Sequence, residues 1–221
     1  MYRCEILSAR RLEDSNSVQY QIHTRHGKPP VVRNFQEVRM GVSWPSAGVS
    51  GAIVVVGMPH EPHRNPFSDT LELLAEYRYD ELGLEPFFSA ICEDYDVYKA
   101  ARAYVDFSDE ACFKPFQTFV SERDRGLRYA DICYRNNPFA GISIVKDYLR
   151  NGNLQLQNSE VRAEAGKMEI NDIDDDLAKN FPLTTALKNV VSGFAANPTS
   201  QPIRLPDSIM PYSTESGWMG G

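Results

Sequence analysis

The strongest constraint on the fold comes from residues 41–57, which read GVSWPSAGVSGAIVVVG. Residues 52–56 form a short, β-branched apolar run between glycines, which is typical of a strand buried on both faces. Residues 40–44 have the character of a partner strand, and the small residues between the two segments suit a turn. We therefore predict a β-hairpin to which the rest of the chain is added.

Strand-like and helix-like segments alternate after this hairpin. Residues 70–79 predict a third strand, antiparallel to the second. Helices and strands then follow in turn, at residues 84–102, 103–107, 113–125, 127–133, 141–150, 153–157 and 183–194. An antiparallel meander followed by alternating helices and strands predicts an α/β protein with a mixed sheet flanked by helices. This is the layout of the ribonuclease H-like fold.

Three regions are expected along the chain. Residues 1–34 contain turn-like and half-exposed segments, and we predict an N-terminal arm or linker outside the main sheet. Residues 35–195 are expected to form the ribonuclease H-like domain. Residues 196–221 contain four prolines and several serines, which predicts a tail without a core of its own.

Composition excludes several classes of protein. The net charge of −7 over 221 residues argues against broad non-specific affinity for nucleic acid, which requires clustered Lys and Arg. No apolar stretch reaches the roughly 20 residues of a membrane helix, and no apolar signal core follows the N-terminus. The four cysteines are widely separated and form no CxxC pair, so we expect buried thiols in a reducing, cytoplasmic compartment.

Asp106 is the principal candidate for chemistry. A nuclease of this fold needs carboxylates from the first strand, a later central strand and a late helix, which together hold two divalent cations about 4 Å apart. Mg²⁺ and Mn²⁺ require oxygen ligands. Asp106 follows an apolar strand and therefore fits the central-strand position. The alternative is that Asp106 only ends a strand or caps the next helix.

The other two positions lack acids. Ser43 stands within the first strand, and Thr184 and Thr185 stand in the last helix. A cluster of acids lies about two turns earlier and could supply a ligand if the helix register differs; its members are Asp174, Asp175 and Asp176. The alternative is that this acidic run is the solvated start of a helix. In an active enzyme, Asp109 or Glu110 would assist.

Basic residues on the predicted helices and loops are candidates for nucleic-acid binding. They are Arg123, Arg125, Arg128, Lys146 and Arg150. If the helices that carry them flank one groove, these side chains could follow a phosphate backbone. The alternative is ordinary surface charge. The pairs His23/His26 and His60/His63 lie in loops and are expected to be surface histidines, and no phosphate-loop or dinucleotide motif is present.

Four segments together resemble a known family. They are GVSWPSAGVSGAIVVVG, LELLAEYRYDE, AYVDFSDEACFKPF and PFAGISIVKDYLRNGNLQLQ, followed by TALKNVVSGF. Their order and spacing resemble the C-terminal, ribonuclease H-like nuclease domain of the large terminase subunit of tailed bacteriophages. The likeness covers roughly residues 35–195.

The resemblance implies roles for individual residues. Asp106 matches the central metal-binding aspartate of the family. Ser43 stands where the first-strand aspartate is expected, Thr185 occupies the aspartate position of the family's Asp-Ala-Leu, and Phe181 stands where another acid is frequent. The resemblance therefore implies a degenerate metal site. Because the sequence has no nucleotide-binding loop, it also implies a relative that stands apart from the packaging motor.

Three hypotheses follow. The first is a terminase-nuclease-like domain of viral DNA packaging, with an impaired metal site, that binds double-stranded DNA, a packaging ATPase or a portal protein in the host cytoplasm. The second is an active two-metal endonuclease that uses Mg²⁺ or Mn²⁺ on Asp106 and acids of residues 172–176. The third is a structural or assembly protein without catalysis.

Overall fold

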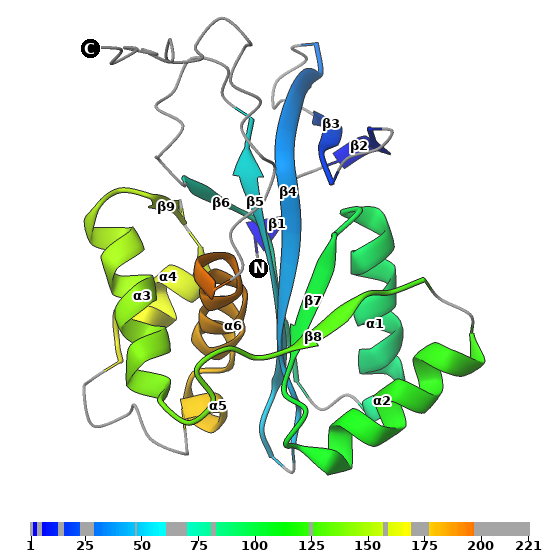
Figure 1. Cartoon of the computed structure of the whole chain (residues 1–221), viewed down its shortest axis with the longest axis vertical. Helices are drawn as coiled ribbons and strands as arrows, with labels where there is room; N and C mark the ends of the chain where they lie inside the picture. Colours follow the sequence, from blue (N-terminus) through cyan, green and yellow to red (C-terminus); the bar gives the residue numbers. More distant parts are fainter. Residues whose placement is uncertain are drawn as a thin grey trace, which may run out of the picture.

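The computed structural model describes residues 2–3, 6–12, 16–22, 29–46, 48–60, 70–80, 83–123, 126–156, 159–168 and 177–196. Its elements, in chain order, are β1 (Tyr2–Arg3), β2 (Ile6–Arg11), β3 (Val18–Ile22), β4 (Val31–Ser43), β5 (Gly51–Pro59), β6 (Leu71–Tyr79), α1 (Leu84–Val97), β7 (Arg102–Val105), α2 (Glu110–Glu122), β8 (Tyr129–Asp131), α3 (Pro138–Arg150), β9 (Leu154–Gln155), α4 (Glu160–Ala165), α5 (Leu177–Asn180) and α6 (Pro182–Ala196). Among the described elements, helices cover both faces of a single sheet (Figure 1).

The nine described strands form one mixed sheet. β4, β5 and β6 are an antiparallel meander at its centre. β7 lies parallel to β4, β8 lies parallel to β7, and β9 lies parallel to β6 on the other side. The predicted hairpin, the antiparallel third strand and the α/β class are therefore confirmed.

The N-terminal region differs from the prediction. We expected residues 1–34 to lie outside the main sheet, but β1 pairs with β6, and β2 and β3 extend the sheet beyond β4. The expected boundary at residue 35 falls inside β4, which has 13 residues. The first part of β4 is largely exposed, so its hydrophobic pattern is weak, and the sequence pattern predicts a strand only at residues 40–44.

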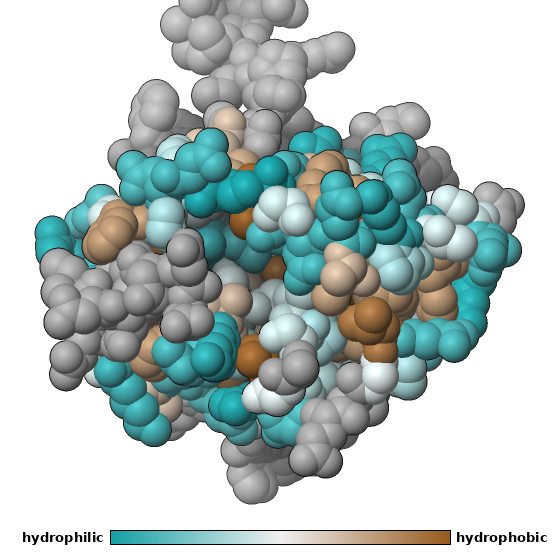
Figure 2. Space-filling view, turned by 90° about the horizontal axis from the view of Figure 1, so that it is seen from below, coloured by the Kyte–Doolittle hydropathy of each residue, from teal (hydrophilic) through white to brown (hydrophobic). Residues whose placement is uncertain are grey.

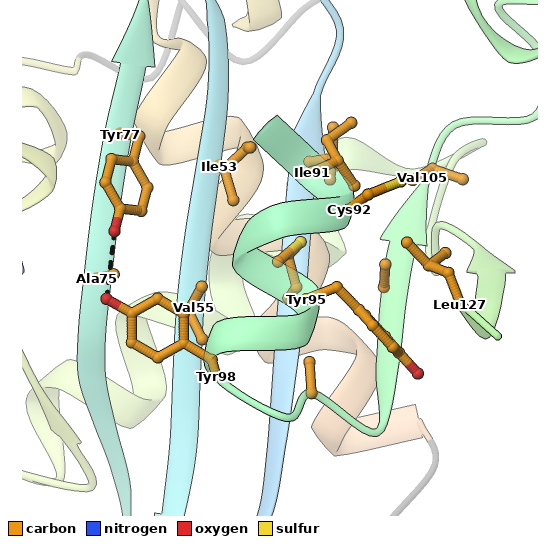
Figure 3. Packing of buried hydrophobic residues seen from close by; sticks show 14 of the residues in the cluster. Ile53, Val55, Ala75, Tyr77, Ile91, Cys92, Tyr95, Tyr98, Val105 and Leu127 are labelled. Atoms are coloured by element: carbon orange, nitrogen blue, oxygen red, sulfur yellow. Dashed lines mark hydrogen bonds between the residues drawn. The ribbon is translucent and has the colours of Figure 1, made fainter. Parts of the chain in front are cut away.

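The central strands are buried because helices cover both of their faces. Ile53 and Val55 of β5 belong to the core beneath α1 and α2, whereas Ala52, Val54 and Val56 belong to the core beneath α3, α4 and α6. This alternation follows from the two-residue period of a strand. Figure 3 shows the first core, where α1 residues pack on β5 and β6 and the hydroxyls of Tyr77 and Tyr98 lie 3.2 Å apart.

Helix α6 lies directly against β4, and a glycine makes this approach possible. A Cβ atom added to Gly41 would lie 2.0 Å from the carbonyl oxygen of Ala186 and 2.9 Å from the nitrogen of Val190. Both are backbone atoms, so a side chain at position 41 would displace the helix. This contact holds the face of α6 that contains Ala186 and Val190 against the C-terminal part of β4.

Local capping explains where other helices begin. α2 starts at Glu110, three residues before the predicted start, because the side chain of Asp109 accepts a hydrogen bond from the Cys112 nitrogen. The short helix α4 was not predicted; its first amides donate to the buried carboxylate of Glu76, a residue of β6. A carboxylate at a helix N-terminus is stabilising, but a residue 84 positions earlier gives no local sequence signal.

Across the described part of the chain, no helix is long and apolar enough to cross a membrane.

Candidate functional site

A pocket of about 450 Å³ lies where β4 and β7 end, beside α5 and α6. It is lined by Val42, Ser43, Trp44, Ser46, Val49, Asp106, Ser108, Asp109, Ile132, Arg135, Pro138, Leu177, Ala178, Lys179, Thr185, Lys188 and Asn189. Figure 2 shows the molecule from below, where the surface is hollowed between regions of mainly hydrophilic residues. The structure thus brings Asp106, Ser43 and Thr185 to one place, although they come from three separate segments.

Asp106 is held at the end of β7 by its neighbours. Its carboxylate oxygen Oδ1 accepts hydrogen bonds from the Ser108 nitrogen at 2.8 Å and from the Ser108 hydroxyl at 2.6 Å. The indole nitrogen of Trp44 donates to the Asp106 carbonyl oxygen at 2.9 Å, which ties the ends of β4 and β7 together. Asp109, and not Asp106, supplies the side-chain cap of α2.

A guanidinium group occupies the space beside the Asp106 carboxylate. Nη2 of Arg135 lies 3.3 Å from Oδ1 of Asp106 and also forms an ion pair with Asp131. Asp131, the last residue of β8, accepts a hydrogen bond from the Phe107 nitrogen at 3.1 Å. Arg135 therefore forms ion pairs with both Asp106 and Asp131. The sequence did not predict Asp131 as a residue of this site.

Helix α6 presents Thr185, Lys188 and Asn189 to the pocket. Asn189 anchors the helix to β4, because its amide nitrogen donates to the Val42 carbonyl oxygen at 2.8 Å. Lys188 is only 6% exposed, and its aliphatic stem passes close to Gly141 of α3. Desolvation lowers the pKa of Lys188, and the negative charge of Asp106 opposes part of that decrease.

Several buried polar atoms at this site have no hydrogen-bond partner among the residues that the structure describes. They include the hydroxyls of Ser43 and Thr185 and the amide oxygen of Asn189. Ser43 is 3% exposed and Thr185 is 7% exposed. Buried polar atoms usually have partners, so unsatisfied ones that line a pocket indicate a place for a polar ligand or water.

The described residues do not fit a pair of divalent cations. Two carboxylates line the pocket, and Asp109 already caps α2 while Asp106 already faces Arg135. Arg135, Lys179 and Lys188 bring positive charge into the same space and would repel metal ions. Within the described ranges, no group of three or more His, Cys, Asp or Glu residues could hold a metal ion.

Asp174, Asp175 and Asp176 lie outside the described residues, so their contribution stays a prediction. Phe181, the position where the family often has an acid, follows α5 and is partly buried against Ile142 and Leu177.

The candidate DNA-binding residues lie in two separate groups. Arg123 ends α2, where it stacks on Phe119 at 3.7 Å and pairs with Glu85 at 3.1 Å, and Arg128 is exposed just before β8. Lys146 and Arg150 are exposed on α3, which covers the opposite face of the sheet (Figure 1). Arg125 lies outside the described residues. The described candidates therefore do not line one groove between neighbouring helices.

The three cysteines that the structure describes are buried or partly buried thiols, as the sequence predicted. Cys92 and Cys112 are buried, and Cys133 is partly buried. Burial, and then the nearby Asp109, raise the pKa of Cys112 to about 12, which makes this thiol a poor nucleophile. Cys4 and the histidines His23, His26 and His63 lie outside the described residues.

Sequence reasoning missed Lys188, Asn189, Arg135 and Asp131. Lys188 and Asn189 follow Thr185 by three and four residues, so helical spacing alone places all three on one face. Arg135 and Asp131 had no comparable signal, because the segment between β8 and α3 brings them to Asp106 through tertiary contacts.

Comparisons with known proteins support the fold. No protein-family model matches the sequence, and no curated protein sequence matches it. The large terminase nuclease from thermophilic phage G20c has a similar structure, with a TM-score of 0.54 at 10% identity, covering 86% of this chain and 93% of that one. The structure of the same nuclease with bound magnesium gives a TM-score of 0.53 at 9% identity. The match covers 86% of this chain and 92% of the nuclease chain.

The large terminase of bacteriophage HK97 gives a TM-score of 0.52 at 8% identity. The match covers 71% of this chain and 39% of the HK97 chain. The chain therefore has a ribonuclease H-like fold. More particularly, its fold is that of large-terminase nuclease domains, as the sequence resemblance predicted.

Proposed function

We propose that this chain is a nuclease-like domain of viral DNA packaging that binds DNA or packaging partners and does not cleave by a two-metal mechanism. The observation that carries the proposal is the pairing of Asp106 with Arg135, in a pocket that is also lined by the neutral residues Ser43 and Thr185. The fold of large-terminase nucleases supports the assignment to packaging.

The chemistry of the pocket supports the loss of cleavage. In two-metal hydrolysis, carboxylates bridge the cations that activate water and stabilise the leaving oxygen. A hydroxyl carries no negative charge and cannot compensate two divalent ions. Lys188 in the same pocket adds electrostatic repulsion, which is strong where water is largely excluded.

Association with DNA would use a local basic surface, because the net charge of the chain is −7. Lys146 and Arg150 on α3 offer one such surface, and Arg123 and Arg128 offer another. Binding to phosphates releases counterions, so affinity for duplex DNA should fall steeply as salt rises. A packaging ATPase or portal protein is the partner expected for the remaining surface.

The test compares cleavage and binding in one set of proteins. Supercoiled plasmid is incubated with Mn²⁺ and either wild-type protein or Asp106→Ala, and we expect no nicking by either. Gel-shift titrations on duplex DNA at several salt concentrations then measure binding. Lys146→Glu/Arg150→Glu and Arg123→Glu/Arg128→Glu, compared as matched double variants, identify the surface that contacts DNA.

The alternative is an active endonuclease in which Mg²⁺ or Mn²⁺ is held by Asp106 and acids of residues 172–176. It is favoured by one observation: Asp176 directly precedes Leu177 in sequence, and Leu177 lines the pocket. Nicking by the wild type that is lost in both Asp106→Ala and Asp174→Asn/Asp175→Asn/Asp176→Asn would establish this enzyme. Absence of both nicking and salt-dependent DNA binding would favour a structural or assembly role.

A further inference from the structure

We propose that the pocket binds a single phosphate group of a DNA strand, with Lys188 and Arg135 supplying positive charge. This inference rests on the proposed function and deepens it, because it names the chemical group that the site recognises. Four observations carry it: the buried lysine, the exposed part of the arginine, the unsatisfied hydroxyls and the balance of charge.

Lys188 is the centre of the site. Its stem is buried against Gly141, and it lines the pocket together with Asp106, whose negative charge opposes part of the decrease in the pKa of Lys188. A buried ammonium is costly unless it is paired, and the lowered pKa of Lys188 reflects that cost. An anion bound in the pocket would stabilise the charged form of this lysine.

The hydroxyls of Ser43 and Thr185 are suited to the same ligand. Each is a hydrogen-bond donor that is more than nine-tenths buried and has no partner among the described residues. Phosphate oxygens accept several hydrogen bonds at once, so two hydroxyls and an ammonium match a tetrahedral anion. The amide oxygen of Asn189 is an acceptor and fits a bridging water.

Arg135 completes the positive side of the pocket. Its Nη2 contacts Asp106 and Asp131, and its side chain is 35% exposed. The planar guanidinium has further N–H donors that suit phosphate. Asp106 and Asp109 also line the pocket, and Asp131 pairs with Arg135, so three acids balance the three cationic side chains. A pocket without a large excess of positive charge suits a single phosphate rather than a run of them.

The surroundings favour a phosphate that is part of a nucleic acid. The pocket volume of about 450 Å³ is larger than a free phosphate ion needs. Tyr134 and Phe139 are 40% and 50% exposed, and they are sequence neighbours of Arg135 and Pro138 in the pocket wall. Exposed aromatic rings beside a basic site are suited to stacking on bases or sugars.

Trp44 provides a direct readout, because it lines the pocket and the only other tryptophan of the chain is Trp218. In the full chain carrying Trp218→Phe, the fluorescence of Trp44 is followed while inorganic phosphate is added at constant ionic strength. Duplex oligonucleotides with and without a 5′-phosphate are then titrated separately. We expect a saturable change with phosphate and with both duplexes, with tighter binding of the duplexes than of inorganic phosphate.

Matched variants show whether Lys188 and Arg135 are responsible for phosphate binding. Lys188→Met keeps an unbranched apolar stem and should weaken phosphate binding about tenfold or more, as expected for loss of a hydrogen bond to a charged group. Arg135→Gln should also weaken it, and this partly exposed position carries the test if Lys188→Met does not fold. Lys167→Met removes an exposed charge after α4 and should bind as the parent protein does.

The inference fails if phosphate leaves the fluorescence of Trp44 unchanged, or if Lys188→Met and Arg135→Gln bind phosphate as tightly as the parent. It also fails if Mn²⁺ binds and phosphate does not. If one of these negative results is found while the duplex still binds in a salt-dependent way that Lys188→Met does not change, the phosphate-site proposal is wrong and the proposed function stands. When duplex binding is absent as well, both proposals fall.

Discussion

Nη2 of Arg135 lies 3.3 Å from the carboxylate of Asp106, which follows the end of β7. The same nitrogen is held by Asp131, so the guanidinium is fixed from two sides. Partly exposed ion pairs contribute little to stability, about 0–1 kcal/mol. The consequence of this ion pair is therefore chemical, because the carboxylate of Asp106 already faces a positive charge.

The first prediction concerns metal affinity. Ser43→Asp/Thr185→Asp adds two carboxylates that face the pocket, and it should increase affinity for Mn²⁺ about tenfold or more, since hard cations require charged oxygen ligands. Adding Arg135→Gln should increase it further by removing a repelling charge. Isothermal titration calorimetry with MnCl₂ measures the change. Thr118→Asp/Ser121→Asp adds the same charge at exposed positions of α2 that do not line the pocket, and equal affinity in this control would contradict the prediction.

The second prediction concerns the contact between α6 and β4. Gly41→Ala should lower the free energy of unfolding by about 3 kcal/mol, because the added methyl group would overlap backbone atoms of α6. Urea denaturation followed by circular dichroism measures the loss. Gly126→Ala is the control, since nothing lies within 4 Å of an added Cβ there. Similar stabilities of the two variants would show that α6 can move away from β4 without cost.

The third prediction concerns a buried ion pair. Arg39 and Glu37 are 4% and 5% exposed and form two hydrogen bonds, and Arg39 also donates to the carbonyl oxygen of Gly193 at 2.8 Å. Arg39→Met should cost about 3–5 kcal/mol of unfolding free energy, because the carboxylate is left buried without its counter-charge. Glu37→Leu/Arg39→Met should recover part of that loss. A double variant no more stable than Arg39→Met would refute the charge explanation.

The fourth prediction concerns pH. The pKa of Lys188 is lowered by burial, so the unfolded chain binds this proton more tightly than the folded chain does. The resulting loss of stability is fully present below the folded pKa and disappears as pH rises towards the ordinary lysine value of 10.5. Wild-type protein should therefore gain stability relative to Lys188→Met between neutral pH and pH 10.5.

Thermal unfolding of both proteins across this pH range measures the difference. Saturating phosphate should reduce the pH dependence of the wild type, because a bound anion favours charged Lys188. A difference between the two proteins that is independent of pH would show that Lys188 titrates as an exposed lysine does.

The sequence by itself determined the central hairpin and the alternation of elements after it. Residues 52–56 are apolar on both sides of the strand because both faces of β5 are covered by helices. This continuous apolar run lies within one short segment, so the sequence alone predicts a buried strand there. The same reading identified Asp106, Ser43 and Thr185, which the fold brings to one pocket.

Only the tertiary structure decided what surrounds Asp106 and where the N-terminal strands lie. Arg135 and Asp131 come to the site through the path of β8 and the segment after it, and no spacing rule in the sequence relates them to Asp106. β1 to β3 pair with other strands through backbone hydrogen bonds, and the alternation of buried Val18 and Tyr20 indicates a strand without indicating which strand it pairs with. Side-chain patterns report burial, whereas the partner of a charged group depends on how distant segments meet.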